Sequence, residues 1–267
     1  VTLPPCLLLL HVDCYRYHLF GGDMKIIETV MEQNGNFCGY RIPLVSYEYK
    51  EPEKLNKDLV FIVDEIEEFY LNVKADSIKN DSDGGTNTKS ILTHNYWKFN
   101  ILDRTEYNSI KKFKKFIGDS YNHYIKTYTP FKFEDVSKDI YAQCWGNKLG
   151  KFDYLDKHTH TSELFSNHLY SLHMEISANY FIKSPGHDTY TRFYSPIILN
   201  RQDYVPIKNK EGHLTIFPSF VEHDTTPNRD PDNYRYTLGM DAINPNPEQA
   251  ESVMAHGTYV KLYEDEK

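Results

Sequence analysis

The sequence has few cysteines, no long hydrophobic run and no excess of basic residues. Its four cysteines are scattered and none forms a C-x-x-C pair, which argues against a zinc ribbon or a disulfide framework. The apolar run at residues 6–10 is far shorter than the ~20 residues that span a bilayer. The formal net charge is −8, whereas nucleic-acid binders usually carry a basic surface. We therefore expect an intracellular, cytoplasmic or organellar protein with reduced thiols and with neither a membrane nor a nucleic-acid partner.

Aromatic residues, by contrast, are abundant. The chain of 267 residues holds 22 Tyr and 15 Phe, which favours a β-rich fold because aromatic side chains pack well on pleated surfaces. The length suits one large domain, residues 1–267. Within it we expect an N-terminal elaboration of helices and strands (1–138), a β core (139–243) and a C-terminal tail (244–267).

The spacing of apolar residues changes along the chain. Three- and four-residue spacing predicts helices over 55–73 and 105–125, and loose alternation predicts a strand over 40–49. Residues 26–40 form an amphipathic segment, and 80–87 have the composition of a loop. Short apolar runs separated by turn residues then predict the strands of a sandwich or barrel: 140–145, 172–182, 192–198, 213–217 and 234–240.

Three histidines indicate a metal site. His158 and His160 stand two apart, and side chains at i and i+2 of a strand point to the same face. His223 follows the run that ends at Phe217-Pro218. Imidazole suits iron, zinc, copper or nickel. We therefore expect His158, His160 and His223 to meet around one metal ion.

Short motifs around these histidines occur in a recognisable order: Trp145-Gly146-Asn147, His158-Thr159-His160, residues 177–185, residues 212–219 with His223, and Arg235-Tyr236-Thr237. In order and spacing they resemble the 2-oxoglutarate/Fe(II) oxygenases common in phages and marine organisms, over roughly residues 80–243. The resemblance implies a mainly β fold with flanking helices (α+β), whose core is a double-stranded β-helix of the jelly-roll or cupin kind.

The resemblance also implies a chemistry. Fe(II) would be held by protein ligands, with open positions for 2-oxoglutarate and O₂. The family converts 2-oxoglutarate to succinate and oxidises an unactivated C–H bond. Arg235 is the candidate for the distal carboxylate of 2-oxoglutarate, because a guanidinium fork matches a carboxylate. Thr237, two residues further on the same strand face, is the candidate for a second hydrogen bond.

One position departs from the usual pattern. A facial triad has a carboxylate two residues after its first histidine, where this chain has His160. The site could contain three histidines, Glu163 could complete it, or the true pair could be His173 and Glu175. We prefer three histidines, because the Trp-Gly-Asn motif precedes His158 as the resemblance implies. Asp224, beside His223, is expected to orient that histidine or to face solvent.

The substrate is not encoded in any single motif. We expect a small, amino-acid-derived metabolite, which would be hydroxylated or oxidatively cyclised as in the algal kainoid synthases that this family resembles. One alternative is a cupin-type metalloenzyme that works without 2-oxoglutarate. The other is a non-catalytic jelly-roll binding protein. The sequence does not indicate an oligomeric state.

Overall fold

The part of the chain that the structure describes forms two facing β-sheets, a separate two-stranded sheet, two long helices, the short helix α2 (Ile91–His94) and the 3-10 helix η2 (Ile101–Asp103). The computed structural model describes residues 16–20, 24–33, 40–73, 86–88, 90–94, 98–128, 140–160, 176–195, 204–243 and 259–263. Among the helices in these ranges, none has both the length and the hydrophobicity of a membrane span.

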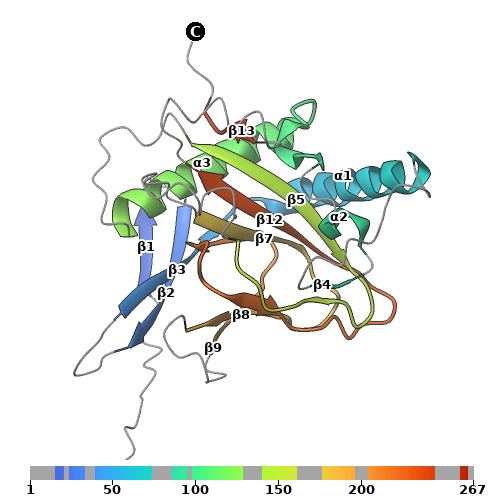
Figure 1. Ribbon diagram of the computed structural model, residues 1–267. Helices are drawn as coiled ribbons and strands as arrows, with labels where there is room; N and C mark the ends of the chain where they lie inside the picture. The colour runs from blue at the N-terminus through green and yellow to red at the C-terminus, as the bar shows by residue number, and fades with distance from the viewer. Residues whose placement is uncertain are drawn as a thin grey trace, which may run out of the picture.

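The larger sheet has eight strands that pair antiparallel throughout, in the order β1-β2-β3-β10-β7-β12-β5-β13 (Figure 1). Chain segments far apart in sequence thereby become neighbours, and β12 lies between β5 and β7. The strands are β1 (Arg16–Phe20), β2 (Met24–Gln33), β3 (Tyr40–Glu48), β5 (Tyr141–Leu149), β7 (Ile176–Lys183), β10 (His213–Pro218), β12 (Arg235–Ile243) and β13 (Val260–Lys261).

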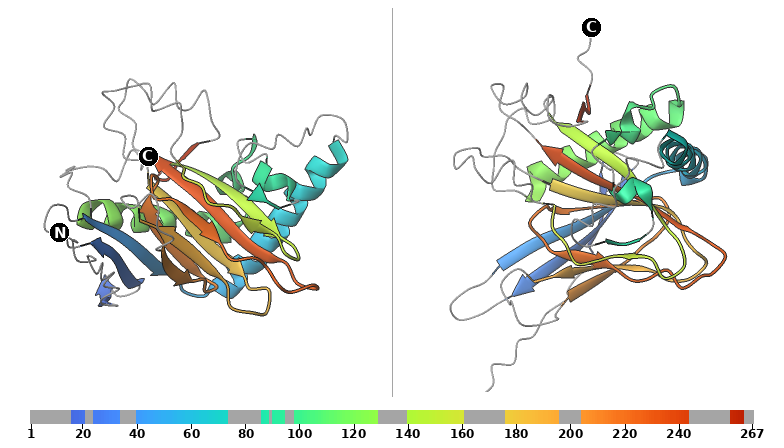
Figure 2. Two further views of the ribbon diagram at one scale, coloured as in Figure 1. Left: turned by 60° about the horizontal axis from the view of Figure 1, so that its bottom comes forward. Right: turned by 45° about the vertical axis from the view of Figure 1, so that its right-hand side comes forward.

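The smaller sheet lies against one face of the larger one (Figure 2). It consists of β11 (His223–Thr225), β8 (Tyr190–Tyr194) and β9 (Tyr204–Lys208), in that order. Phe193 of β8 packs against Phe217 of β10, with ring centroids 4.9 Å apart. Two facing antiparallel sheets with these crossovers form a double-stranded β-helix. The expected fold class, mainly β with flanking helices around a jelly-roll core, is confirmed.

The two long helices, α1 (Pro52–Val73) and α3 (Asn108–Tyr128), cover the other face of the larger sheet (Figures 1 and 2). Their apolar stripes join the main core, in which Leu59, Val63, Phe113 and Tyr121 are fully buried. Both predicted helices are confirmed: α1 begins three residues before its predicted start, and α3 begins and ends three residues after its predicted bounds. The apolar spacing was sufficient here because each helix buries one continuous stripe.

Alternate residues of β12 face these two environments. Tyr236, Leu238, Met240 and Ala242 belong to the core beneath the helices. The odd-numbered residues of the strand therefore face the smaller sheet. Arg235, Thr237, Gly239 and Asp241 thus share the interior between the two sheets.

Several local predictions need correction. The amphipathic segment at 26–40 is largely strand β2, which pairs with β3 from Lys25 to Gln33. The predicted loop 80–87 ends in a short strand, β4 (Thr86–Asn87), which pairs with β6 (Tyr154–Leu155). Residues 80–85, 172–175 and 196–198 lie outside the described residues. The strand β4 was missed because a two-residue strand depends on a partner that is distant in sequence.

Candidate metal centre

Backbone hydrogen bonds bring the three histidines together. His158 and His223 exchange both of their backbone bonds, at N···O distances of 3.0 and 2.9 Å. The amide of His160 donates to the carbonyl of Ser219, at 3.0 Å. The segment 158–160 was expected to be a strand, but it is an extended segment with a single bridge residue, His158. That pairing is enough to place both imidazoles beside His223.

The three imidazoles form a compact group. A ligand nitrogen of each lies within 4.8 Å of the others, and among the described residues this is the one group of His, Cys, Asp or Glu side chains with such geometry. The Nε2 atoms of His158 and His160 are 3.2 Å apart. Tetrahedral or octahedral ligands at ~2.0–2.1 Å from an ion are separated by similar distances. The spacing of the predicted ligands therefore suits one metal ion.

Each ring has an acceptor at its Nδ1 atom. His158 Nδ1 donates to the Asp156 carbonyl at 2.6 Å, and His223 Nδ1 donates to the Val221 carbonyl at 3.0 Å. His160 Nδ1 donates to a carboxylate oxygen of Asp241 at 2.7 Å. These acceptors carry no proton, so the partners assign the Nδ1–H tautomer to each neutral ring. Three Nε2 lone pairs then converge, an arrangement that a cation stabilises.

Burial keeps two of the rings neutral. It lowers the pKa of His158 to about 4, and the nearby His160 lowers it further in the same direction. Burial, followed by the two neighbouring histidines, also holds the pKa of His223 well below its usual value. Neutral imidazole is the form that binds metal. Both side chains are therefore ready to bind metal at neutral pH without first losing a proton.

Acidification is expected to destabilise the metal-free protein between about pH 6.5 and pH 4. In that interval the unfolded chain binds a proton at His158 and the folded chain does not, so stability falls as pH falls. The contribution of His158 at pH 4.5 is roughly 2–3 kcal/mol. Urea unfolding of wild type and His158→Gln at pH 7 and pH 4.5 measures it. An equal loss of stability in both proteins would contradict the assignment of a low pKa to His158.

A polar cluster lies behind His160. Asp241 Oδ1 accepts hydrogen bonds from His160 Nδ1 and from the hydroxyl of Ser177, each at 2.7 Å. The hydroxyls of Ser177 and Ser219 are 2.8 Å apart, and both side chains are buried. The sequence prediction did not include Asp241. Its position six residues after Arg235 on one strand places it on the same face, and that alternation was a usable signal.

Trp145 and Gly239 fix the other side of His160. The indole ring lies 5.6 Å from the His160 ring, between centroids, and covers Gly239, its register partner across β5 and β12. A Cβ added to Gly239 would lie 2.5 Å from the Trp145 ring. Gly239 is therefore required for the indole to reach this position.

Gly239→Ala is expected to lower stability by about 1–3 kcal/mol, the usual cost of overpacking a core. It should also weaken metal binding, because the displaced indole presses on His160. Gly146→Ala is the matched control: its Cβ would lie 2.7 Å from Val63, on the helix side of the sheet. Thermal unfolding and a Co(II) titration distinguish the two variants. Equal metal affinity of both would show that Trp145 does not position His160.

Arg235 is fully buried, yet no carboxylate of the described residues lies within ion-pair distance of its guanidinium. Its Nη1 donates to the Thr226 carbonyl and its Nη2 to the Thr225 hydroxyl, each at 2.8 Å. Its Nε has no hydrogen-bond partner among the described residues. Burial lowers the pKa of Arg235 to about 10, partly offset by Asp153, so the group stays charged at pH 7. A buried cation without a counter-ion is costly, which favours an anion here.

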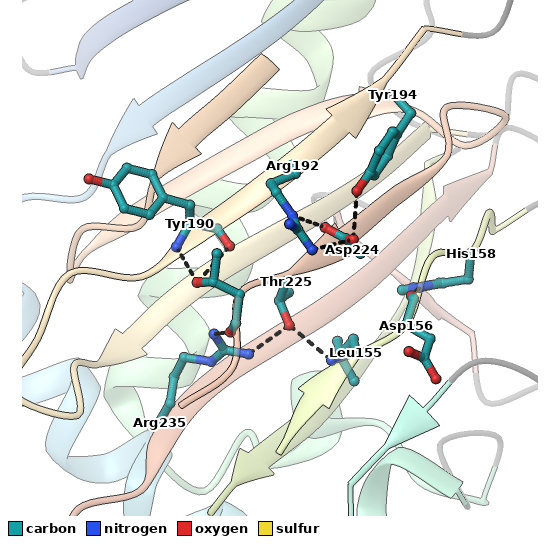
Figure 3. Close-up of polar contacts among 10 residues, drawn as sticks. Leu155, Asp156, His158, Tyr190, Arg192, Tyr194, Asp224, Thr225 and Arg235 are labelled. Carbon is teal, nitrogen blue, oxygen red and sulfur yellow. Dashed lines mark hydrogen bonds and ion pairs between the residues drawn. The ribbon is translucent and has the colours of Figure 1, made fainter. Parts of the chain in front are cut away.

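This anion site is joined to β11, the strand that begins with His223, by the bond from Arg235 to Thr225 (Figure 3). Thr225 is two residues after His223 on β11, about 7 Å along the strand. Thr237, predicted as a second donor, is half-buried and faces the same interior as Arg235. That role of Thr237 stays a prediction. Among the described residues, the hydroxyl that bonds to the Arg235 guanidinium is that of Thr225, which also accepts from the Leu155 amide at 2.9 Å. Thr225 was missed because its pairing depends on the fold.

The expectation for Asp224 was wrong. Its carboxylate is buried, where it accepts two bonds from Arg192 at 2.6 Å each and one from the Tyr194 hydroxyl at 2.7 Å (Figure 3). It therefore does not face solvent and does not bond to the His223 ring, whose Nδ1 donates to the Val221 carbonyl. Bidentate pairing on neighbouring strands fixes β11 against β8, and that fixes His223 indirectly. The alternative ligands Glu163 and Glu175, with His173, lie outside the described residues.

Residues 143–241 match the model of a protein family described as "Putative 2OG-Fe(II) oxygenase". The resemblance to 2-oxoglutarate/Fe(II) oxygenases is thereby confirmed for this segment, which contains all three histidines, Arg235 and Asp241. The match covers less than half of the chain. No curated protein matches the chain. The expected phage or marine type and the kainoid-synthase branch stay predictions.

Three solved structures show a distant likeness. They are a Pseudomonas putida prolyl-4-hydroxylase (15% identity, TM-score 0.36), a 2OG-Fe(II) oxygenase family oxidoreductase from Burkholderia pseudomallei (13%, 0.36) and a Trichoplax adhaerens prolyl hydroxylase in complex with a peptide fragment of hypoxia inducible factor (13%, 0.35). The alignments cover 52%, 52% and 54% of this chain. They cover 66%, 59% and 60% of those chains, less than two thirds of their length. These likenesses are too distant to bear on function.

Proposed function

We propose that the protein is an Fe(II)- and 2-oxoglutarate-dependent oxygenase that acts on a small molecule with O₂ as the oxidant. One observation carries the proposal: three Nε2 acceptors converge beside a buried guanidinium that has no carboxylate partner among the described residues. A metal ion would bind the lone pairs of the three Nε2 atoms, and a dicarboxylate would balance the charge of the guanidinium. The family that matches residues 143–241 is described by Fe(II) and 2-oxoglutarate. Fe(II) is a metal ion that three imidazoles can bind, and 2-oxoglutarate is a dicarboxylate that a guanidinium can bind.

The residues divide into two binding units. His158, His160 and His223 would hold the iron through their Nε2 atoms. Arg235 would bind the distal carboxylate of 2-oxoglutarate, with Thr225 fixing the guanidinium and Thr237 available as a second donor. Imidazole is a good ligand for iron, and an arginine fork fits a carboxylate. Bound iron and 2-oxoglutarate would supply the redox chemistry that oxidises a C–H bond.

The surroundings of His223 exclude water from one side of the site. The rings of Phe193 and Phe217 lie 5.7 and 4.7 Å from the His223 ring, between centroids, and both phenylalanines are fully buried. Apolar walls of this kind strengthen electrostatic interactions in a site and protect reactive species from side reactions. The protein thus positions the cofactors, supplies charged groups and excludes water, while the cofactors would supply the redox chemistry.

The two alternative functions explain fewer observations. A cupin-type metalloenzyme without 2-oxoglutarate accounts for the histidines but leaves the buried Arg235 Nε unexplained. A non-catalytic jelly-roll binding protein leaves three converging Nε2 lone pairs without a cation. The narrower substrate proposal, an amino-acid-derived metabolite that is hydroxylated or cyclised, rests on the sequence resemblance and on no contact among the described residues.

Calorimetric titration with 2-oxoglutarate and with glutarate tests the proposal, using protein with and without Mn(II) as an inert substitute for iron. Glutarate has both carboxylates but lacks the 2-oxo group that chelates a metal. We expect Mn(II) to strengthen the binding of 2-oxoglutarate at least tenfold and to leave glutarate binding little changed. Mn(II) binding without any 2-oxoglutarate binding would favour the cupin alternative. Failure to bind Mn(II) and Fe(II) at all would favour the non-catalytic one.

A further inference from the structure

Asp241 differs from every other acceptor around the histidines because it is charged. The Nδ1 atoms of His158 and His223 donate to backbone carbonyls, whereas the Nδ1 of His160 donates to a carboxylate at 2.7 Å. The side chains of His160 and Asp241 are only 9% and 19% exposed, so solvent screens their interaction weakly. A carboxylate that accepts from a ligand histidine fixes the ring and raises the basicity of its metal-binding nitrogen.

His160 stands at the position where a facial triad has its carboxylate, so the negative charge of its partner Asp241 affects the net charge of the metal site. In a 2-His-1-carboxylate site, a carboxylate ligand lowers the net charge of a divalent ion and its ligands to +1. Three neutral histidines leave that charge at +2. Asp241, one imidazole away from the metal position, restores +1 for the extended unit. His160 and Asp241 together are thus electrostatically equivalent to the carboxylate ligand that this chain lacks.

The larger sheet holds Asp241 rigidly in this role. Gln143, Asp241, Ser177 and Phe217 form one row across β5, β12, β7 and β10. Ser177 donates to the same Asp241 oxygen that accepts from His160, and it also contacts Ser219. Ser219 in turn accepts the backbone bond from His160. The carboxylate and the ring are therefore fixed to the same strands.

We propose that Asp241 is a positioning residue that acts through His160, so that the His160–Asp241 pair replaces the carboxylate of a facial triad. This inference rests on the proposed iron site. Asp241 does not touch the metal in this account. It orients the imidazole, holds the proton on Nδ1 and supplies the negative charge.

The first test is a Co(II) titration of wild type, Asp241→Asn and Asp188→Asn. Asparagine keeps the shape and an acceptor oxygen but removes the charge, and we expect Co(II) affinity to fall about 10–100-fold. Asp188 makes an exposed ion pair with Lys208 at 2.7 Å, so its substitution removes the same charge away from the site and should change affinity less than threefold. Equal affinity of both variants would overturn the role of Asp241. Failure of the wild type to bind Co(II) would overturn both this inference and the proposed function.

A second test separates action through the ring from a general structural role. In the His160→Asp background the ligand is itself a carboxylate and no imidazole remains for Asp241 to orient, so Asp241→Asn should weaken Co(II) binding much less than it does in the wild-type background. The same loss in both backgrounds would mean that Asp241 only supports the fold.

A third measurement needs no variant. In the NMR spectrum of the Zn(II)-loaded protein, the Nδ1 proton of His160 should lie further downfield than those of His158 and His223. The latter two are internal controls because they donate to carbonyls. Three equivalent Nδ1 protons would contradict the proposal even if every substituted protein failed to fold.

Discussion

Replacing His223 with alanine is expected to abolish tight metal binding. His223 is the most buried of the three histidines, and its ring lies 4.4 Å from that of His158 and 4.9 Å from that of His160, between centroids. Its loss leaves two nitrogen ligands, too few to hold iron against water. The loss of affinity should exceed the roughly 10–100-fold that removal of an outer-sphere partner causes. Anaerobic Fe(II) titration measures it directly.

His213→Ala is the matched control for this prediction. His213 is the first residue of β10, the strand that precedes β11 in the sequence. Its register partner is Glu48 of β3. Its removal should leave Fe(II) affinity within about twofold of wild type, well under the ~1.4 kcal/mol that a tenfold change represents. If both variants bind Fe(II) as wild type does, the three histidines are not the metal site.

Arg235→Gln is expected to weaken 2-oxoglutarate binding about 100-fold while Fe(II) affinity stays near that of wild type. The guanidinium is the charged group of the proposed carboxylate site, and hydrogen bonds to charged groups contribute ~1.5–3 kcal/mol each. Glutamine fills much of the buried volume, which limits the cavity that alanine would leave. Calorimetry with the Mn(II)-loaded protein measures the change.

Arg235→Lys tells apart the charge and the shape of this site. Lysine keeps a positive charge but lacks the planar fork, so it should recover only part of the lost affinity. Full affinity in Arg235→Gln would show that the cosubstrate carboxylate binds elsewhere. Loss of Fe(II) with unchanged 2-oxoglutarate affinity would likewise contradict the assignment.

The sequence was most informative where spacing alone defines geometry. The apolar stripes of α1 and α3 could be read directly because a helix places residues three and four apart on one face. The two-residue spacing of His158 and His160 put both rings on one side of an extended segment, although pairing there is limited to one bridge. Arg235 was predicted from its place after His223 in the motif order and from the match between a guanidinium fork and a carboxylate.

Contacts across strands could not be predicted in the same way. Thr225 contacts Arg235 because β11 lies beside the start of β12, and Asp224 pairs with Arg192 because β11 joins β8 in register. Asp241 reaches His160 from a strand 81 residues away in the sequence. Each depends on the sheet order, which residue spacing does not specify. Alternation along β12 nevertheless links Asp241 to Arg235 and is the one signal that could have revealed it.

The most direct test of the central claim is an anaerobic titration of the Fe(II)-loaded protein with 2-oxoglutarate, monitored by visible absorption. A 2-oxoacid that chelates Fe(II) produces a weak metal-to-ligand charge-transfer band. We expect this band to appear and to saturate at one 2-oxoglutarate per iron, and we expect Arg235→Gln to require a much higher concentration to produce it. Binding of iron without the band would contradict the claim that the histidines and Arg235 form one site for Fe(II) and 2-oxoglutarate.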